Sequence, residues 1–272
     1  MKLWLNGQIV AADRAHIDPA DRGFLLGDGL FETLLAQGGQ VCRGHAHFKR
    51  LRQGAEYLAI PLDMPDAALL DACAELLQVN ALAEARASLR LTLTRGPGPR
   101  GLLPPAAPAP TIMITAAPAP PPPRDLSVIT SSVRRNELGP LTRYKTLNYL
   151  ENICARREAQ TQGADEAVML NSAGNAACAS AATLWIVERG VLVTPPVADG
   201  ALPGTARARV FDVAPELALS VREETISPAR LAAAQEVFLS NALIGACPVR
   251  RLDGRALTPR LGLRIRDALV DS

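Results

Sequence analysis

The sequence predicts an α+β fold of two domains that meet at a cleft. Segments with helical periodicity and segments with strand-like alternation are interleaved along the whole chain, without the strict alternation of a doubly wound sheet. The length of 272 residues suits two modest domains. A proline-rich stretch at residues 116–124 divides them, because consecutive prolines favour an extended, stiff connector. We therefore expect a small domain at residues 1–117, a linker at 118–124 and a larger domain at 125–272.

Local patterns indicate the elements of the first domain. Asn6-Gly7 is a strong signal for a tight hairpin between two short strands. Apolar side chains recur at intervals of three and four in the expected helices, and leucines alternate with polar residues in the third expected strand. The expected elements are strands at residues 2–5, 8–10, 88–94 and 111–115 and helices at 45–58 and 64–79.

The same patterns continue in the second domain. Glycine-containing turns separate short apolar runs, and a serine or threonine followed by proline marks two helix starts, at Ser227 and Thr258. The helix starting at Ser227 and a C-terminal helix after Pro259 complete the set. The other expected elements are helices at residues 147–162 and 205–217 and strands at 126–130, 167–170, 182–187, 191–194, 237–239 and 248–252.

Composition excludes several classes of protein. A formal net charge of +2, with no block of like charge, argues against nucleic acid as the main partner. No apolar run approaches membrane-spanning length, and the N-terminus lacks the apolar region of a secretory signal. The five cysteines never form a C-x-x-C pair, which argues against a disulfide framework and a zinc site, and no metal is expected. We therefore expect a soluble cytoplasmic enzyme that acts on a small molecule.

Lys145 is the first candidate catalytic residue. The chain has only three lysines, and Lys145 lies among largely apolar neighbours where a strand or loop meets a helix. A lysine amine in such a place can form an imine with a carbonyl compound. Taken alone, a lysine at a helix start can equally be an ordinary surface residue.

Two features could bind a phosphate. Residues 202–207 open a helix with small side chains, and the backbone amides and positive dipole end of a helix start attract anions. Arg50 could hold the same phosphate through two nitrogens. The alternative for residues 202–207 is an ordinary junction between loop and helix, and the alternative for Arg50 is a solvated arginine on a helix.

Other catalytic motifs are absent. No G-x-S-x-G, G-x-G-x-x-G or Walker A motif occurs at a suitable junction, and His45 and His47 are interpreted as structural.

Six segments in order resemble the fold-type IV pyridoxal-phosphate enzymes, also called class IV aminotransferases. They cover nearly the whole chain and lie at residues 21–23, 27–33, 47–51, 141–150, 202–204 and 240–245. The family includes branched-chain and D-amino-acid aminotransferases and aminodeoxychorismate lyase. The resemblance implies the two-domain fold of that family, pyridoxal 5'-phosphate in the cleft between the domains, and a homodimer.

The resemblance also implies roles for single residues. Lys145 would form a Schiff base with the cofactor, and Tyr149 would contact its phenolic oxygen. The cofactor phosphate would be bound by Arg50, Gly204, Thr205 and Ala206. Asn241 would touch both cofactor and substrate. Phe31 would touch the substrate, and Arg100 would bind a substrate carboxylate, in the family often across the dimer interface.

Cys178 departs from the family pattern. It occupies the position of a glutamate that keeps the pyridine nitrogen of the cofactor protonated. A thiol is a weak hydrogen-bond partner and would not stabilise a pyridinium as a carboxylate does. The electron sink should then be weaker, and a catalytically impaired member of the family is one interpretation.

Among the reactions of the family, the sequence favours the lyase. Aminodeoxychorismate lyase releases pyruvate and forms 4-aminobenzoate for folate biosynthesis, and because aromatisation drives this elimination, a weak electron sink should harm it less than transamination. Residues 27–33, 94–101 and 240–243 resemble the lyase in particular. The second hypothesis is an aminotransferase acting on branched-chain or D-amino acids, and the third is a non-catalytic protein that kept the fold.

Overall fold

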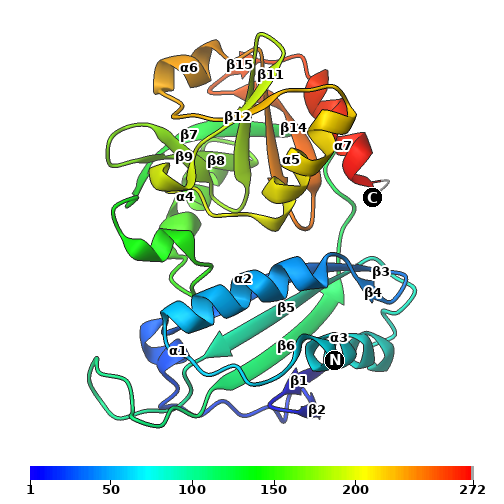
Figure 1. The fold of residues 1–272 in the computed structure, drawn as a ribbon, viewed down its shortest axis with the longest axis vertical. Coiled ribbons are helices and arrows are strands. Elements are labelled where there is room, and N and C mark those ends of the chain that lie inside the picture. The colour runs from blue at the N-terminus through cyan, green and yellow to red at the C-terminus, as the bar shows by residue number, and fades with distance from the viewer. Residues whose placement is uncertain (271–272) are drawn as a thin grey trace. The chain divides into compact units, whose positions relative to one another are not determined.

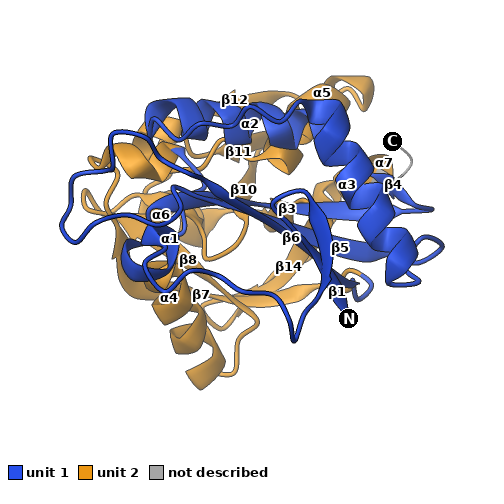
Figure 2. Cartoon of the chain, turned by 90° about the horizontal axis from the view of Figure 1, so that it is seen from below, with its two compact units in different colours: residues 1–121, 144–148 blue, residues 122–143, 149–272 orange. Residues whose placement is uncertain are grey.

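The computed structural model describes residues 1–270 and divides into two compact units (Figure 2). Unit 1 consists of Met1–Pro121 and Tyr144–Asn148, and unit 2 consists of Pro122–Arg143 and the chain from Tyr149 onward. Residues 144–148, which carry Lys145, thus pack with unit 1 and not with the rest of the 125–272 segment. Backbone pairing with residues 29–31 and a stacked contact of Tyr144 on Tyr57, with ring centroids 4.4 Å apart, account for this.

Unit 1 is built on an antiparallel sheet of six strands in the order β2-β1-β6-β5-β3-β4. Two long helices, α2 (Gly44–Tyr57) and α3 (Asp66–Val79), pack on it, and a short helix α1 (Arg22–Leu26) precedes β3 (Figure 1). The strands are β1 (Lys2–Leu5), β2 (Gln8–Ala11), β3 (Gly29–Gln37), β4 (Gln40–Val41), β5 (Ala87–Thr94) and β6 (Thr111–Pro118).

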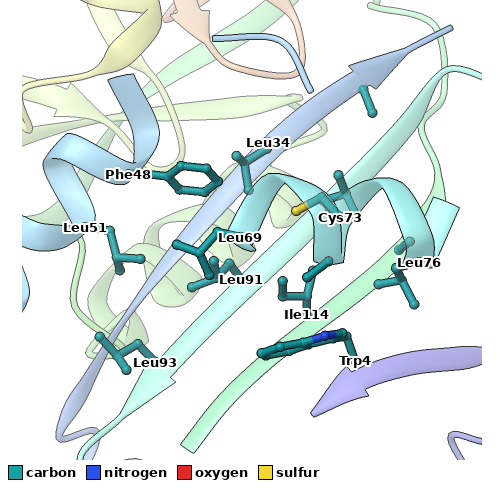
Figure 3. Packing of buried hydrophobic residues seen from close by; sticks show 14 of the residues in the cluster. Trp4, Leu34, Phe48, Leu51, Leu69, Cys73, Leu76, Leu91, Leu93 and Ile114 are labelled. Atoms are coloured by element: carbon teal, nitrogen blue, oxygen red, sulfur yellow. The ribbon is translucent and has the colours of Figure 1, made fainter. Parts of the chain in front are cut away.

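The core of unit 1 lies between the helices and one face of the sheet. Leu89, Leu91 and Leu93 alternate along β5 and are fully buried, as the pattern of that strand predicted. They meet apolar side chains of α2 and α3, among them Phe48 and Leu69 (Figure 3). The residues between these leucines, such as Arg90, project from the opposite face. This second face is the one that matters for chemistry.

Unit 2 is built on a mixed sheet of nine strands. The strand order is β12-β11-β10-β13-β14-β7-β8-β9, and β15 pairs with β14. The helices are α4 (Leu150–Thr161), α5 (Thr205–Glu216), α6 (Pro228–Ala233) and α7 (Leu261–Val270). The strands are β7 (Leu126–Arg135), β8 (Glu166–Asn171), β9 (Ala176–Ala179), β10 (Thr183–Glu188), β11 (Val191–Thr194), β12 (Val221–Glu223), β13 (Glu236–Asn241), β14 (Gly245–Leu252) and β15 (Arg255–Ala256).

The α+β class is confirmed, and most predicted elements occur within a few residues of their expected bounds. Two boundaries were wrong. The strand expected at 111–115 continues to Pro118, because Ala116, Ala117 and Pro118 remain paired with the first residues of β5. The helix expected at 147–162 begins at Leu150, because the amide of Leu147 bonds to Gly29 instead. In residues 1–270 no helix is both long enough and apolar enough to cross a bilayer.

Candidate active site

Lys145 lies on a short extended segment that runs beside β3. The amide of Phe31 donates to the carbonyl of Lys145 over 2.9 Å, and the amide of Leu147 donates to the carbonyl of Gly29 over 3.0 Å. Glycine is required at position 29, because a Cβ there would lie 2.4 Å from the carbonyl oxygen of Leu93 and 2.8 Å from the side chain of Leu147. This pairing fixes the backbone of Lys145 on a rigid sheet.

Lys145 and Phe31, both predicted site residues, are in contact through their side chains. Lys145 Nζ lies 4.1 Å from the centroid of the Phe31 ring, and the guanidinium carbon of Arg90 lies 3.9 Å from it. The negative face of an aromatic ring attracts cations, so both contacts are favourable. Sequence reasoning missed Arg90. Its signal was present, since Arg90 is the one charged residue in the alternating leucines of β5.

Arg50 is held by a buried carboxylate. Glu32 accepts hydrogen bonds from Arg50 Nε (2.7 Å) and Arg50 Nη2 (2.6 Å), and its Oε2 lies 2.7 Å from His47 Nδ1. Burial alone would raise the pKa of the fully buried Glu32 carboxyl, but the hydrogen bonds from Arg50 and His47 outweigh it and hold the pKa below its ordinary value. Glu32 is therefore an anion that fixes the plane of the Arg50 guanidinium. The sequence analysis did not assign it a role.

In unit 2, the start of α5 has the features of an anion site. Gly204 is the N-cap and brings no side chain, so the first-turn amides of Thr205 and Ala206 receive no capping bond from it. A Cβ at position 204 would lie 3.0 Å from Thr183 Oγ1 and 3.3 Å from Arg207 Cβ. The glycine therefore leaves open a cradle that a larger residue would fill, and a phosphate suits such a cradle.

Cys178 lies on β9, opposite Met169 of β8, and is buried. Burial raises the pKa of its thiol, Arg135 lowers it and Glu166 raises it further, with a net increase. The side chain at this position is therefore a neutral thiol at physiological pH. The carboxylate of Glu166 is engaged elsewhere, because it accepts hydrogen bonds from Arg156 and from the hydroxyl of Ser180.

Asn241 shapes a turn at the end of β13. Its Oδ1 accepts from the amides of Leu243 and Ile244, both over 2.9 Å, and its Nδ2 donates to the carbonyl of Ala181 over 3.0 Å. Asn241 thus orders the backbone of residues 241–244.

Tyr149 is half-buried at the N-cap of α4 and makes no capping bond through its side chain.

The predicted site residues are divided between the two units. Unit 1 carries Phe31, Arg50, Arg100 and Lys145, of which Phe31 and Lys145 touch. Unit 2 carries Tyr149, Cys178, Gly204, Thr205, Ala206 and Asn241. Arg100 is exposed on the segment between β5 and β6. Among residues 1–270, no group of three histidine, cysteine or acidic side chains is placed to hold a metal ion.

Comparison with known proteins places these residues in a family. The family model "Amino-transferase class IV" matches residues 29–252. A putative branched-chain-amino-acid aminotransferase of Methanocaldococcus jannaschii is 36% identical over 262 residues, which are 94% of this chain and 90% of the relative.

Solved structures agree with this assignment. The branched-chain amino acid aminotransferase of Escherichia coli has a TM-score of 0.94 at 27% identity, over 99% of this chain and 93% of that one. The 4-amino-4-deoxychorismate lyase of Pseudomonas aeruginosa has a TM-score of 0.86 at 33% identity, over 99% and 98%. The chain belongs to the class IV aminotransferase family, whose members are pyridoxal-phosphate enzymes that act on small molecules.

Proposed function

We propose that this enzyme is a lyase that converts 4-amino-4-deoxychorismate into 4-aminobenzoate and pyruvate. The observation that carries the proposal is the buried, neutral thiol of Cys178 at the position of the family's glutamate. A thiol leaves the pyridine ring a poorer electron sink, and the reaction that suffers least is one driven by formation of an aromatic product. The similarity to the lyase of P. aeruginosa along 99% of the chain supports the same choice.

The residues present fit pyridoxal 5'-phosphate. The open cradle at Gly204 and the amides of Thr205 and Ala206 suit its phosphate, and Arg50, oriented by Glu32, supplies a positive charge for it. Lys145 is the amine for covalent attachment. When bound, the cofactor supplies a carbonyl group and a conjugated ring that withdraws electrons from the substrate.

Lys145 is also the proposed base. Its amine would take the proton from the substrate carbon that bears the amino group and would be held for this task by the pairing of its backbone with β3. The electron pair freed with that proton would form the last double bond of the ring as the bond from the ring to the enolpyruvyl oxygen breaks, which leaves 4-aminobenzoate. The released enolpyruvate would take up a proton at its methylene carbon and become pyruvate. Phe31, against which the Lys145 amine lies, would form one wall beside the substrate.

Three further residues are assigned to recognition. Arg100 would bind a substrate carboxylate, since a guanidinium pairs well with a carboxylate. Asn241 would act through the turn that it orders, and Tyr149 would contact the phenolic oxygen of the cofactor.

We further propose that the enzyme is a homodimer and that it acts in the cytoplasm, in folate biosynthesis. The exposed side chains of Leu102 and Leu103, beside Arg100, suit burial against a second copy.

An aminotransferase acting on branched-chain amino acids is the second candidate. The 36% identity to a putative branched-chain-amino-acid aminotransferase favours it. A preference for D-amino acids has less support. The resemblance to the D-amino-acid enzymes implies an arginine and, two residues later, a histidine that hold the substrate carboxylate; here Arg100 is followed at that spacing by Leu102.

The two activities are separated by a direct assay. Purified enzyme receives aminodeoxychorismate without any keto acid, and 4-aminobenzoate and pyruvate are measured. In parallel, L- and D-amino acids are offered with keto acids. The proposal expects pyruvate release that needs no keto acid and that disappears in Lys145→Ala. Amino-group transfer at a comparable rate would overturn the lyase, and the absence of both activities would favour an impaired member of the family.

A further inference from the structure

Residues 95–110 connect β5 to β6 without a helix or strand, and they carry Arg100. The base of this segment is tied to the chain before α1 by its backbone. The amide of Arg22 donates to the carbonyl of Gly96 over 3.0 Å, and the amide of Gly98 donates to the carbonyl of Ala20 over 3.2 Å. The tip, residues 101–103, is held differently.

One buried guanidinium holds the tip. Arg22 donates from Nη1 to the carbonyl of Gly101 (3.0 Å), from Nη2 to that of Leu102 (2.8 Å) and from Nη1 to that of Leu103 (3.4 Å). The Leu102 and Leu103 side chains are 82% and 85% exposed, whereas Arg22 is 4% exposed. Within the chain, apolar burial of these leucines contributes little to the order of the tip. Among the described residues, the hydrogen bonds from Arg22 are the polar contacts that hold the backbone of the tip.

Asp28 balances the charge of Arg22. Its Oδ2 accepts from Arg22 Nε and from Arg95 Nε, each over 2.8 Å. Burial tends to raise the pKa of the Asp28 carboxyl, but the bonds from Arg95 and Arg22 outweigh it and lower the pKa. Arg95 in turn donates to the carbonyls of Leu58 and Ala59, which follow α2. Asp28 is thus an anion that connects Arg22 to the main body of unit 1.

The glycines of the segment make room for this arrangement. A Cβ at Gly98 would lie 2.9 Å from Cδ of Arg22. Gly96 has a φ of +80°, and a Cβ there would lie 1.8 Å from the carbonyl oxygen of Ala109. The close packing of Gly98 against Arg22 therefore requires a residue without a side chain at position 98.

We propose that Arg22 is a positioning residue for substrate recognition. By holding the carbonyls of residues 101–103, it sets the place of the neighbouring Arg100, whose guanidinium binds the substrate carboxylate. The inference rests on the proposed function in one respect only, the role of Arg100. The order of the segment itself is independent of the reaction catalysed.

The first test reads the order of the segment and needs no substrate. Native holoenzyme is treated briefly with trypsin, and cleavage after Arg100 is quantified by mass spectrometry. Arg22→Gln should raise the rate of this cleavage roughly tenfold, because local opening becomes easier. Arg22→Lys, which keeps the charge beside Asp28 but loses the fork of donors, should fall between wild type and Arg22→Gln.

Arg52 provides a matched control. It pairs with Asp66 and donates to the carbonyls of Leu62 and Met64, and so holds a different segment of unit 1 by the same kind of contact. Arg52→Gln should leave cleavage after Arg100 unchanged. Equal cleavage in wild type and Arg22→Gln would overturn the inference. If Arg22→Gln does not fold, Gly98→Ala, which displaces the Arg22 side chain, should give the same increase.

The second test separates recognition from general stability. Arg22→Gln should raise KM for the substrate roughly tenfold, the effect of about 1.4 kcal/mol, with kcat within about twofold of wild type. An equal fall of kcat at unchanged KM would contradict the positioning role. Arg100→Gln is measured beside it. If Arg100→Gln leaves KM unchanged, the role proposed for Arg100 fails, whereas the trypsin result still decides whether Arg22 orders the segment.

Discussion

Replacing Glu32 by glutamine tests how the protein holds Arg50. The substitution keeps the volume of the side chain and removes its charge. Three short contacts depend on that charge, two from Arg50 and one from His47. Removing one partner of a buried ion pair costs about 3–5 kcal/mol. We expect Glu32→Gln to lower the free energy of unfolding at pH 7 by an amount in this range.

The direction of the Glu32 pKa shift determines how this loss of stability depends on pH. The pKa of Glu32 is lower in the folded protein than its ordinary value, so the unfolded chain binds the proton more tightly. The stabilisation is therefore complete above the pKa of the unfolded chain, about 4.3, and is lost as the pH falls through the lower pKa of the folded protein. The difference between wild type and Glu32→Gln should be largest at neutral pH and should shrink in acid.

Urea unfolding at a series of pH values measures this difference. Glu75→Gln is the matched control, because Glu75 lies in the same unit on the exposed side of α3, and its effect should stay within about 0.5 kcal/mol. A loss below about 1 kcal/mol in Glu32→Gln, or a loss that is the same at pH 7 and in acid, would refute the account of Glu32 as a buried anion.

Three further predictions concern unit 2 and the cysteines. Cys178→Glu should speed the transamination half-reaction, since a carboxylate would stabilise a protonated pyridine nitrogen; unchanged rates in single-turnover measurements would contradict the role given to this position. Gly204→Ala should weaken cofactor binding roughly tenfold in a fluorescence titration, because the new methyl group enters the cradle 3.0 Å from Thr183 Oγ1; unaltered affinity would show that the start of α5 does not hold the phosphate. A maleimide at pH 8 should modify the exposed Cys154 before Cys73, which is buried and whose pKa burial raises to about 12; mass spectrometry that finds Cys73 modified first would contradict the packing described for α3.

Local patterns in the sequence were sufficient for much of the fold. The alternating leucines of β5 and the spacing of apolar residues in α2 and α3 are local signals, and both elements occur nearly where expected. The Ala-rich β9 was missed, because four small residues carry no periodicity that distinguishes a strand from a turn. The family resemblance, in contrast, depended on motifs spread along the chain and was confirmed by the match over residues 29–252.

The parts of the site that the sequence did not reveal depend on contacts between distant residues. The pairing of Lys145 with Phe31 joins residues more than a hundred positions apart, so no local window contains it. The partnership of Glu32 with Arg50 joins β3 to α2, and that of Arg22 with the tip at Leu102 joins α1 to the segment after β5. Charged residues in such contacts look like surface residues until the fold brings them together and buries them.

The central claim is that the amine of Lys145 carries the cofactor. Holoenzyme is reduced with borohydride, digested and mapped by mass spectrometry, with Lys145→Ala treated in the same way. The account predicts a phosphopyridoxyl group on the peptide that contains Lys145 and on neither Lys2 nor Lys49. A modified Lys49, or an unmodified Lys145 in protein that retains the cofactor, would contradict it.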